Sequence, residues 1–263
     1  MNSLYTYEDG LYRPGPLTVG PWSPDAQHGG PVAALLAGAV EEAGPAEGEP
    51  PPGGPAMQVV RLSVELTRPA PVSPLAVVSE VVRPGRNVQL VEATLLADGR
   101  EVARARALRI RRLEVDVPVD RSGAPAPPPE EVEAKEAEVI RTAFAGAVDL
   151  RFVKGHWDEA GPVTMWARLR VPVVEGRHPS ALQRVAAIAD FGNGVSRLLD
   201  FATHTFINPD LTVALARVPE GEWLLFDVVS RYSAEGYGQA ESQIYDATGP
   251  VGRSVQSLIL SPR

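Results

Sequence analysis

Residues 62–68 read Leu-Ser-Val-Glu-Leu-Thr-Arg, and residues 211–217 read Leu-Thr-Val-Ala-Leu-Ala-Arg. In both segments an apolar residue recurs at every second position, which is typical of a β-strand with one buried face. The match extends outward, because residues 62–110 align with residues 211–260 at a constant offset of about 149, with little or no gapping. The sequence therefore predicts an internal duplication.

The two aligned segments predict the same series of strands. Each run is apolar or alternating and ends at turn residues such as Asp98-Gly99, which is a hairpin signal. The short connections predict antiparallel neighbours. The predicted strands are 62–66, 75–82, 88–96 and 102–110 in the first copy, and 211–217, 223–230, 237–245 and 251–260 in the second.

A helical stretch precedes each copy. The run Pro31–Val40 is apolar on every face, which predicts a buried helix, and Pro31 suits a first helical turn. Before the second copy, Ser180–Ala202 predicts a helix with a break at Gly192-Asn193-Gly194. We therefore expect an α+β fold in which a curved antiparallel sheet of about five strands wraps around a central helix, twice.

Proline and glycine divide the chain. They cluster at residues 44–55 and 118–129, and both clusters predict loops. The second is followed by the charged run Glu130–Glu136, which favours a short helix. The predicted organisation is an N-terminal half, a linker containing a short helix, and a C-terminal half, at residues 1–112, 113–137 and 138–263.

Composition narrows the function classes. The 263 residues are 44% hydrophobic and 22% charged, which is typical of a globular protein. The net charge of −8 argues against binding to nucleic acid or to anionic membrane surfaces. The absence of cysteine excludes disulfides and thiolate metal sites, and the four histidines include no closely spaced pair, so we expect no metal. With no signal peptide and no apolar run long enough to span a bilayer, we expect a cytoplasmic protein.

Several motifs, in this order and spacing, resemble one family over nearly the whole chain except the linker. They are Gly20–Pro31, Ala189–Gly194, Asn208–Val213, Gly221–Leu225 and Ser254–Ser257. With them the sequence resembles the acyl-CoA thioesterase II-like family, whose members are double hotdog thioesterases.

The resemblance implies two fused hotdog folds with their sheets side by side and an active site between the halves. It also implies hydrolysis of a fatty-acyl or other acyl-CoA thioester without a cofactor. In the better-known members an Asp, a Thr and a Gln position the attacking water. Asp190 and Gln256 stand at two of these positions, but Asn208 stands at the third, so the sequence departs from the pattern there.

The chemistry of thioester hydrolysis suits these residue types. Asp190, between apolar neighbours, could take a proton from water, while the amides of Gln256 and Asn208 could orient that water. Backbone N–H groups could stabilise the developing oxyanion. The residues expected to bind substrate in this way, or to line the mouth of the site, are His28, Gly29, Gly30, Gly192, Asn193 and Gly194.

Two other functions remain open at this point. The Asn at position 208 is compatible with a non-catalytic acyl-CoA or lipid-binding protein. A hotdog enoyl-CoA hydratase is less favoured, because we find no Asp/His pair near a helix start. For any of the three, we expect a homo-oligomer, since subunit association often covers exposed sheet edges.

Overall fold

The computed structural model describes residues 3–44, 56–134 and 143–263. Its helices are α1 (Gly29–Glu42), α2 (Ala181–Ala189) and α3 (Gly192–Val195). Its strands are β1 (Tyr5–Glu8), β2 (Leu11–Pro14), β3 (Met57–Glu65), β4 (Leu75–Arg83), β5 (Val88–Ala97), β6 (Arg100–Arg111), β7 (Val148–Lys154), β8 (Val163–Leu169), β9 (His204–Ile207), β10 (Asp210–Leu215), β11 (Leu224–Tyr232), β12 (Tyr237–Asp246) and β13 (Gly249–Pro262).

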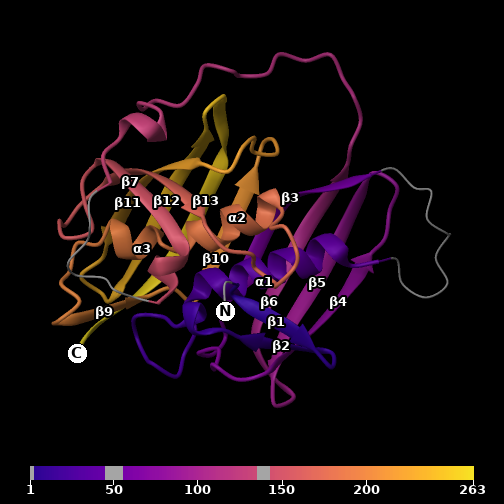
Figure 1. The fold of residues 1–263 in the computed structure, drawn as a ribbon, viewed down its shortest axis with the longest axis horizontal. Coiled ribbons are helices and arrows are strands. Elements are labelled where there is room, and N and C mark those ends of the chain that lie inside the picture. The colour runs from indigo at the N-terminus through magenta and orange to yellow at the C-terminus, as the bar shows by residue number, and fades with distance from the viewer. Residues whose placement is uncertain (1–2, 45–55, 135–142) are drawn as a thin grey trace.

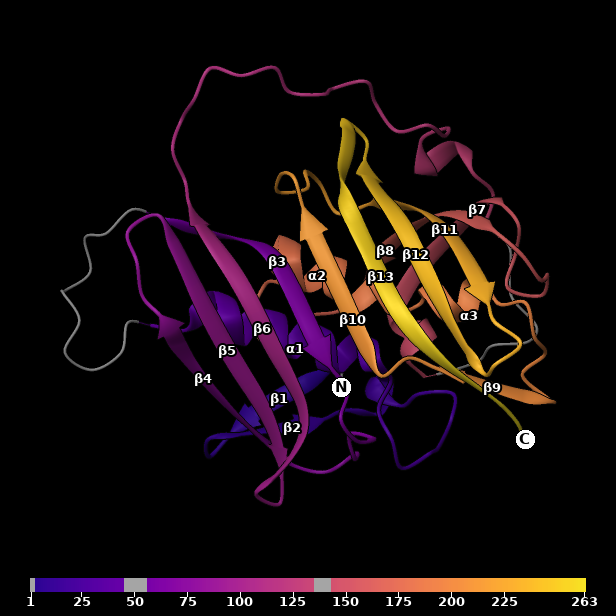
Figure 2. The ribbon, with the colours of Figure 1, turned by 180° about the vertical axis from the view of Figure 1, so that it is seen from behind.

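The strands form one continuous sheet, with the helices packed on one of its faces (Figures 1 and 2). The strand order is β1-β2-β4-β5-β6-β3-β10-β13-β12-β11-β8-β7, and β9 pairs with β13 off this path. Strands β3 and β10 therefore lie at the centre, side by side and antiparallel. Read outward from this pair, β6, β5 and β4 on one side correspond to β13, β12 and β11 on the other.

The central strand pair joins the two aligned sequences at equivalent residues. Ser63 lies opposite Thr212, and the Thr212 hydroxyl donates a hydrogen bond of 3.1 Å to the Ser63 hydroxyl. The same relation holds between the helices, where the Gln183 side-chain amide donates to the Ala34 carbonyl over 3.3 Å. Both pairs are 149 positions apart, which equals the offset of the sequence repeat.

The helix α1 is the centre of the core. It is buried over most of its length and packs against β3, β4, β5 and β6 as well as against α2. Gly30 allows the two helices to approach closely, because a Cβ there would lie 2.5 Å from the Ala187 carbonyl oxygen. The helix α2 begins with a capping box between Ser180 and Gln183. Within the described residues, no helix is both long and apolar enough to cross a bilayer.

The eight strands expected from the repeat are confirmed, with small shifts at their ends. The sequence prediction of about five strands per half is too low, because β1 and β2 precede α1, β7 and β8 precede α2, and β9 lies before β10. The expected helix over 180–202 is also too long. It ends at Ala189, resumes only as the short α3, and gives way to turns where the Ser196 hydroxyl bonds back to the Gly192 carbonyl.

The segment that follows β6 is extended over residues 112–127 and arches across one end of the molecule (Figure 1). It is anchored where Arg121 pairs with Glu220 and where the Trp166 indole donates to the Pro127 carbonyl. The short helix expected near Glu130–Glu136 is only a 3₁₀ turn at Pro129–Glu131, and the end of that run lies outside the described residues.

A buried ion pair stabilises the turn between β12 and β13. The Asp246 carboxylate is fully buried and contacts two nitrogens of the Arg217 guanidinium, each at 2.6 Å. It also accepts hydrogen bonds from the backbone N–H groups of Glu220 and Thr248. Burial alone would raise the pKa of Asp246, but the hydrogen bonds from Arg217, Glu220 and Thr248 outweigh it and hold that pKa well below its ordinary value.

We predict that Asp246→Asn lowers the free energy of unfolding by about 3 kcal/mol at pH 7, because it leaves a largely buried guanidinium without its counter-charge. Since the folded-state pKa of Asp246 is depressed, its contribution is complete above the unfolded pKa of about 3.9 and is lost as the pH falls further. Urea denaturation should therefore show the gap between wild type and variant narrowing below about pH 4.

The matched control is Asp227→Asn, because Asp227 is exposed and its carboxylate accepts from the Thr164 hydroxyl. This control should stay within about 0.5 kcal/mol of wild type. An Asp246→Asn protein as stable as wild type at pH 7 would contradict the role of the ion pair.

Candidate active site

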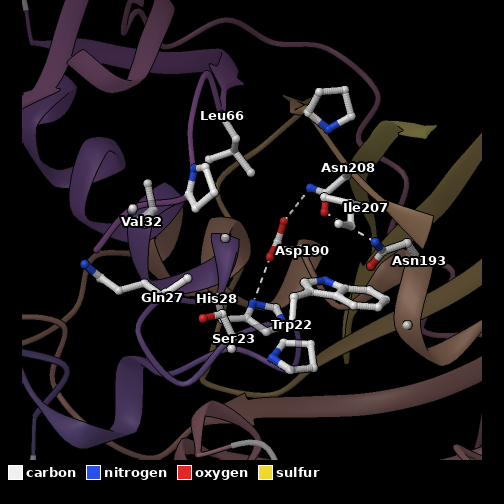
Figure 3. A pocket seen from close by; sticks show the side chains of 18 of the residues that line it. Trp22, Ser23, Gln27, His28, Val32, Leu66, Asp190, Asn193, Ile207 and Asn208 are labelled. Carbon is white, nitrogen blue, oxygen red and sulfur yellow. Dashed lines mark hydrogen bonds and ion pairs between the residues drawn. The ribbon is translucent and has the colours of Figure 1, made fainter. Parts of the chain in front are cut away.

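A buried carboxylate lies where the two main helices meet. Asp190 directly follows α2, is only 2% exposed, and reaches the N-terminal end of α1 (Figure 3). Gly29 makes this approach possible, because a Cβ at that position would lie 2.6 Å from Asp190 Oδ2. The N-terminal end of α1, where the helix dipole is positive, therefore faces the carboxylate.

Two side-chain amides hold one oxygen of this carboxylate. Asn208 Nδ2 donates to Asp190 Oδ1 over 2.7 Å, and Gln256 Nε2 donates to the same oxygen over 3.2 Å. Asn208 lies just before β10 and Gln256 lies on β13, so the sheet positions both amides. Asn208 and Gln256, the other two residues predicted to be catalytic, thus both lie within hydrogen-bond distance of Asp190.

His28 contacts the second oxygen. Its Nδ1 lies 2.8 Å from Asp190 Oδ2. The Gly30 N–H also approaches Nδ1, at 3.0 Å. The ring is held between Phe144 and Phe191, with centroid distances of 4.9 and 5.0 Å. His28 thus forms the Asp/His pair at a helix start that sequence reasoning did not find, because its members are far apart in the chain.

Two backbone N–H groups of the 192–194 segment, those of Asn193 and Gly194, already have acceptors. The Asn193 N–H donates to Gln256 Oε1 over 3.1 Å, and the Gly194 N–H donates to the Phe191 carbonyl. The Asn193 side chain donates to Asn208 Oδ1 over 3.3 Å and to the Phe206 carbonyl over 3.0 Å. This segment therefore supports the amides that hold Asp190, and it offers few donors to a ligand.

Asp190 borders a cavity of about 410 Å³. One wall comes from residues 20–23 and 26–29, Val32 and residues 66–70, and the other comes from Trp157 together with parts of the chain between Asp190 and Ile259. Most of the lining is apolar. Trp22 packs against Phe201 and Phe206, with centroid distances of 5.6 and 5.3 Å. The cavity thus suits an apolar group whose reacting end meets a single carboxylate.

The predicted site residues divide into two groups. Those that line the cavity are His28, Gly29, Asp190, Asn193, Gly194 and Asn208. Gln256, Gly30 and Gly192 lie behind this surface, and Gln256 is almost completely buried. Sequence reasoning missed Trp157, Phe201 and Arg68 as lining residues. Trp22 lies inside the motif Gly20–Pro31, so this motif could have predicted Trp22 as a lining residue.

The opposite end of the helix pair has an equivalent arrangement without the polar network. There the Glu41 carboxylate accepts a hydrogen bond from Ser180, the N-cap of α2. Burial raises the pKa of Glu41, and the hydrogen bond from Ser180 only partly offsets this effect. At an offset of 149, Asn208 and Gln256 correspond to Val59 and Ala107, which are apolar and buried. Within the described residues, therefore, Asp190 is held by two side-chain amides and Glu41 is not.

Two family models match the chain. The acyl-CoA thioesterase N-terminal domain matches residues 18–110, and the acyl-CoA thioesterase C-terminal domain matches residues 119–260. No curated protein matches the chain.

Similar solved structures cover nearly all of the chain. A protein of unknown function with a hot dog fold from Alicyclobacillus acidocaldarius is 18% identical, with a TM-score of 0.73 over 98% of this chain and 95% of that one. A protein from Novosphingobium aromaticivorans is 22% identical, with a TM-score of 0.73 over 98% of both chains. The acyl-CoA thioesterase II TesB2 from Mycobacterium marinum is 18% identical, with a TM-score of 0.66 over 100% of this chain and 96% of that one. At these identities the structures show the hot dog fold.

The close contact at Gly29 gives a direct test of the site geometry. We predict that Gly29→Ala displaces the Asp190 carboxylate and lowers the free energy of unfolding by about 1–3 kcal/mol, because the new methyl group overlaps the carboxylate oxygens. The control is Gly146→Ala, since a Cβ there meets no atom within 4 Å. Denaturation curves and a crystal structure check both variants. A Gly29→Ala protein with unchanged stability and intact hydrogen bonds at Asp190 would disprove the contact.

Proposed function

The chain belongs to the acyl-CoA thioesterase family, and from this membership we propose that it hydrolyses an acyl-CoA thioester with a water molecule activated by Asp190. The observation that carries the proposal is the carboxylate of Asp190, which is buried yet borders an apolar cavity. Burial of a charged carboxylate is unfavourable unless it is compensated, so such a group in a cleft is a candidate for catalysis.

The proposal includes the organisation of the chain. We propose that residues 1–112 and 138–263 are two hotdog units fused in tandem and joined by the linker 113–137. The mirrored strand order about β3 and β10 supports this division. So does the position of α1 against β3–β6 and of α2 against β8 and β10. In this arrangement the cavity lies between the units, with Asp190 from the second facing the helix start of the first.

The number of hydrogen bonds that the Asp190 carboxylate can accept indicates which of its oxygens takes the proton from water. An ionised carboxylate offers about four lone-pair positions. Asn208 and Gln256 occupy those of Oδ1, and His28 Nδ1 lies 2.8 Å from Oδ2 on one side. The remaining position on Oδ2 is the one that can accept the proton of a water molecule. Asn208 and Gln256 then act by holding Asp190, with Asn208 performing this task where the better-known family members have Thr.

The reaction follows from this assignment. The water oxygen attacks the thioester carbonyl carbon while its proton passes to Asp190 Oδ2. The Gly29 N–H, in the first turn of α1, is the donor best placed at the cavity wall for the carbonyl oxygen as it becomes negative. The carbon–sulfur bond then breaks, and the proton held by Asp190 passes to the leaving thiolate. The products are a carboxylic acid and free coenzyme A.

We predict that Asp190→Asn lowers kcat for thiol release from acyl-CoA by about 100- to 10,000-fold, because the amide cannot accept the proton of water. The folded structure should persist, because the Asn side-chain oxygen can still accept from Asn208 and Gln256. Asp227→Asn is the matched control and should keep wild-type activity. Unchanged turnover in Asp190→Asn would reject the assignment. If the wild type binds acyl-CoA but shows no turnover over a panel of chain lengths, the non-catalytic alternative replaces it.

A second candidate function is favoured by the His28–Asp190 pair. In the hydration of an enoyl-CoA, water adds to the β-carbon and its proton reaches the α-carbon, and an Asp/His pair is the usual sign of hotdog enzymes that do this. With an enoyl-CoA substrate, we predict release of free thiol with the conjugated double bond intact in the acid product. Loss of the conjugated double bond without thiol release would assign the hydratase reaction instead.

A further inference from the structure

We propose that Arg68 binds a phosphate group of coenzyme A at the border of the cavity. This inference rests on the proposed function, because it concerns recognition of the same substrate. It is drawn from a difference between two equivalent arginines, of which one is fully paired and the other is not.

Arg68 is an available cation beside the site. It lines the cavity and its side chain is exposed. The only side-chain hydrogen bond of Arg68 in the described part of the chain runs to the Glu101 carbonyl, at 2.7 Å. No carboxylate within the described residues forms an ion pair with it. Most donors of its guanidinium are therefore free for a ligand.

The equivalent arginine in the second half has a carboxylate partner that Arg68 lacks. Arg217 corresponds to Arg68, and it donates to the Pro250 carbonyl as Arg68 donates to the Glu101 carbonyl, which is the equivalent position. Arg217 is in addition held by both carboxylate oxygens of Asp246. The residue that corresponds to Asp246 is Ala97, so Arg68 keeps the position but lacks the carboxylate.

Charge and polarity indicate a phosphate. The cavity interior is mostly apolar, which suits the acyl group, whereas Arg68 is exposed at its border. A second guanidinium, that of Arg263, lies 5.6 Å from the ring of Trp22, another lining residue. In a chain with a net charge of −8, these two guanidinium groups can attract the anionic end of coenzyme A. The planar guanidinium matches the geometry of phosphate oxygens.

The test compares ligands that differ in their phosphates. We expect Arg68→Gln to weaken the binding of coenzyme A about tenfold in calorimetry, since an exposed charged contact of this kind contributes on the order of a tenfold change. Binding of pantetheine, which lacks phosphate, should not change. In kinetics the same variant should raise KM for acyl-CoA about tenfold with kcat almost unchanged, and it should leave acyl-pantetheine hydrolysis unaffected.

A second variant tests the same phosphate contact while it keeps Arg68. Ala97→Asp copies the arrangement of Asp246 beside Arg217 and should pair with the Arg68 guanidinium. We expect weaker binding of coenzyme A in this variant as well, with pantetheine again unaffected. The control is Arg83→Gln, since Arg83 is an exposed arginine on β4, away from the cavity lining.

The possible outcomes distinguish a failure of the Arg68 inference from a failure of the proposed thioesterase function. Equal loss of affinity for coenzyme A and pantetheine would overturn the inference, because Arg68 would then act only through the shape of the site. Unchanged affinity for coenzyme A in Arg68→Gln would also overturn it, as would an effect confined to acyl groups that carry a carboxylate. If the wild type releases no thiol from either thioester, the proposed function fails, while the binding of coenzyme A still decides the role of Arg68.

Discussion

The structure depends on a buried carboxylate held at the junction of its two halves. Asp190 ends the α2 helix and faces the first turn of α1, so the N-terminal end of that helix, two side-chain amides and His28 surround its carboxylate. Removing such a charge from water costs several kcal/mol, which only this full set of partners can offset. This one group constrains the approach of the two helices at Gly29 and the positions of the amides of Asn208 and Gln256.

The internal duplication explains the location of the candidate active site and why the two helix junctions differ. Antiparallel packing of two equivalent helices creates two similar junctions, Asp190 with the start of α1 and Glu41 with the start of α2. At the second junction the amide positions are apolar. The Arg109 guanidinium there bonds to the Val40 and Ala43 carbonyls at the end of α1. The junction at Asp190 thus has a polar network beside a cavity, whereas at the junction of Glu41 the corresponding amide positions are apolar.

Much of this arrangement is predictable from the sequence, because strands with one buried face carry a period of two and the repeat fixes their order. The outer strands β1, β2, β7 and β8 lie outside the aligned repeat, so the repeat does not predict them. Strands β1 and β2 are also only four residues long, which is too short for a periodic signal. Asp190 and Gln256 were predicted from motif resemblance. The contact between Asp190 and His28 is not predictable in this way, because it depends on how two distant helices pack, and local patterns contain no information about that.

The most direct test of the central claim is a crystal structure with an acyl-CoA analogue whose thioester cannot be hydrolysed. The account predicts the acyl group in the apolar cavity, with a water molecule on Asp190 Oδ2 about 3–3.5 Å from the carbonyl carbon. The carbonyl oxygen should face the Gly29 N–H. A thioester group bound away from Asp190, or a water held only by other side chains, would contradict the claim that this carboxylate performs the chemistry.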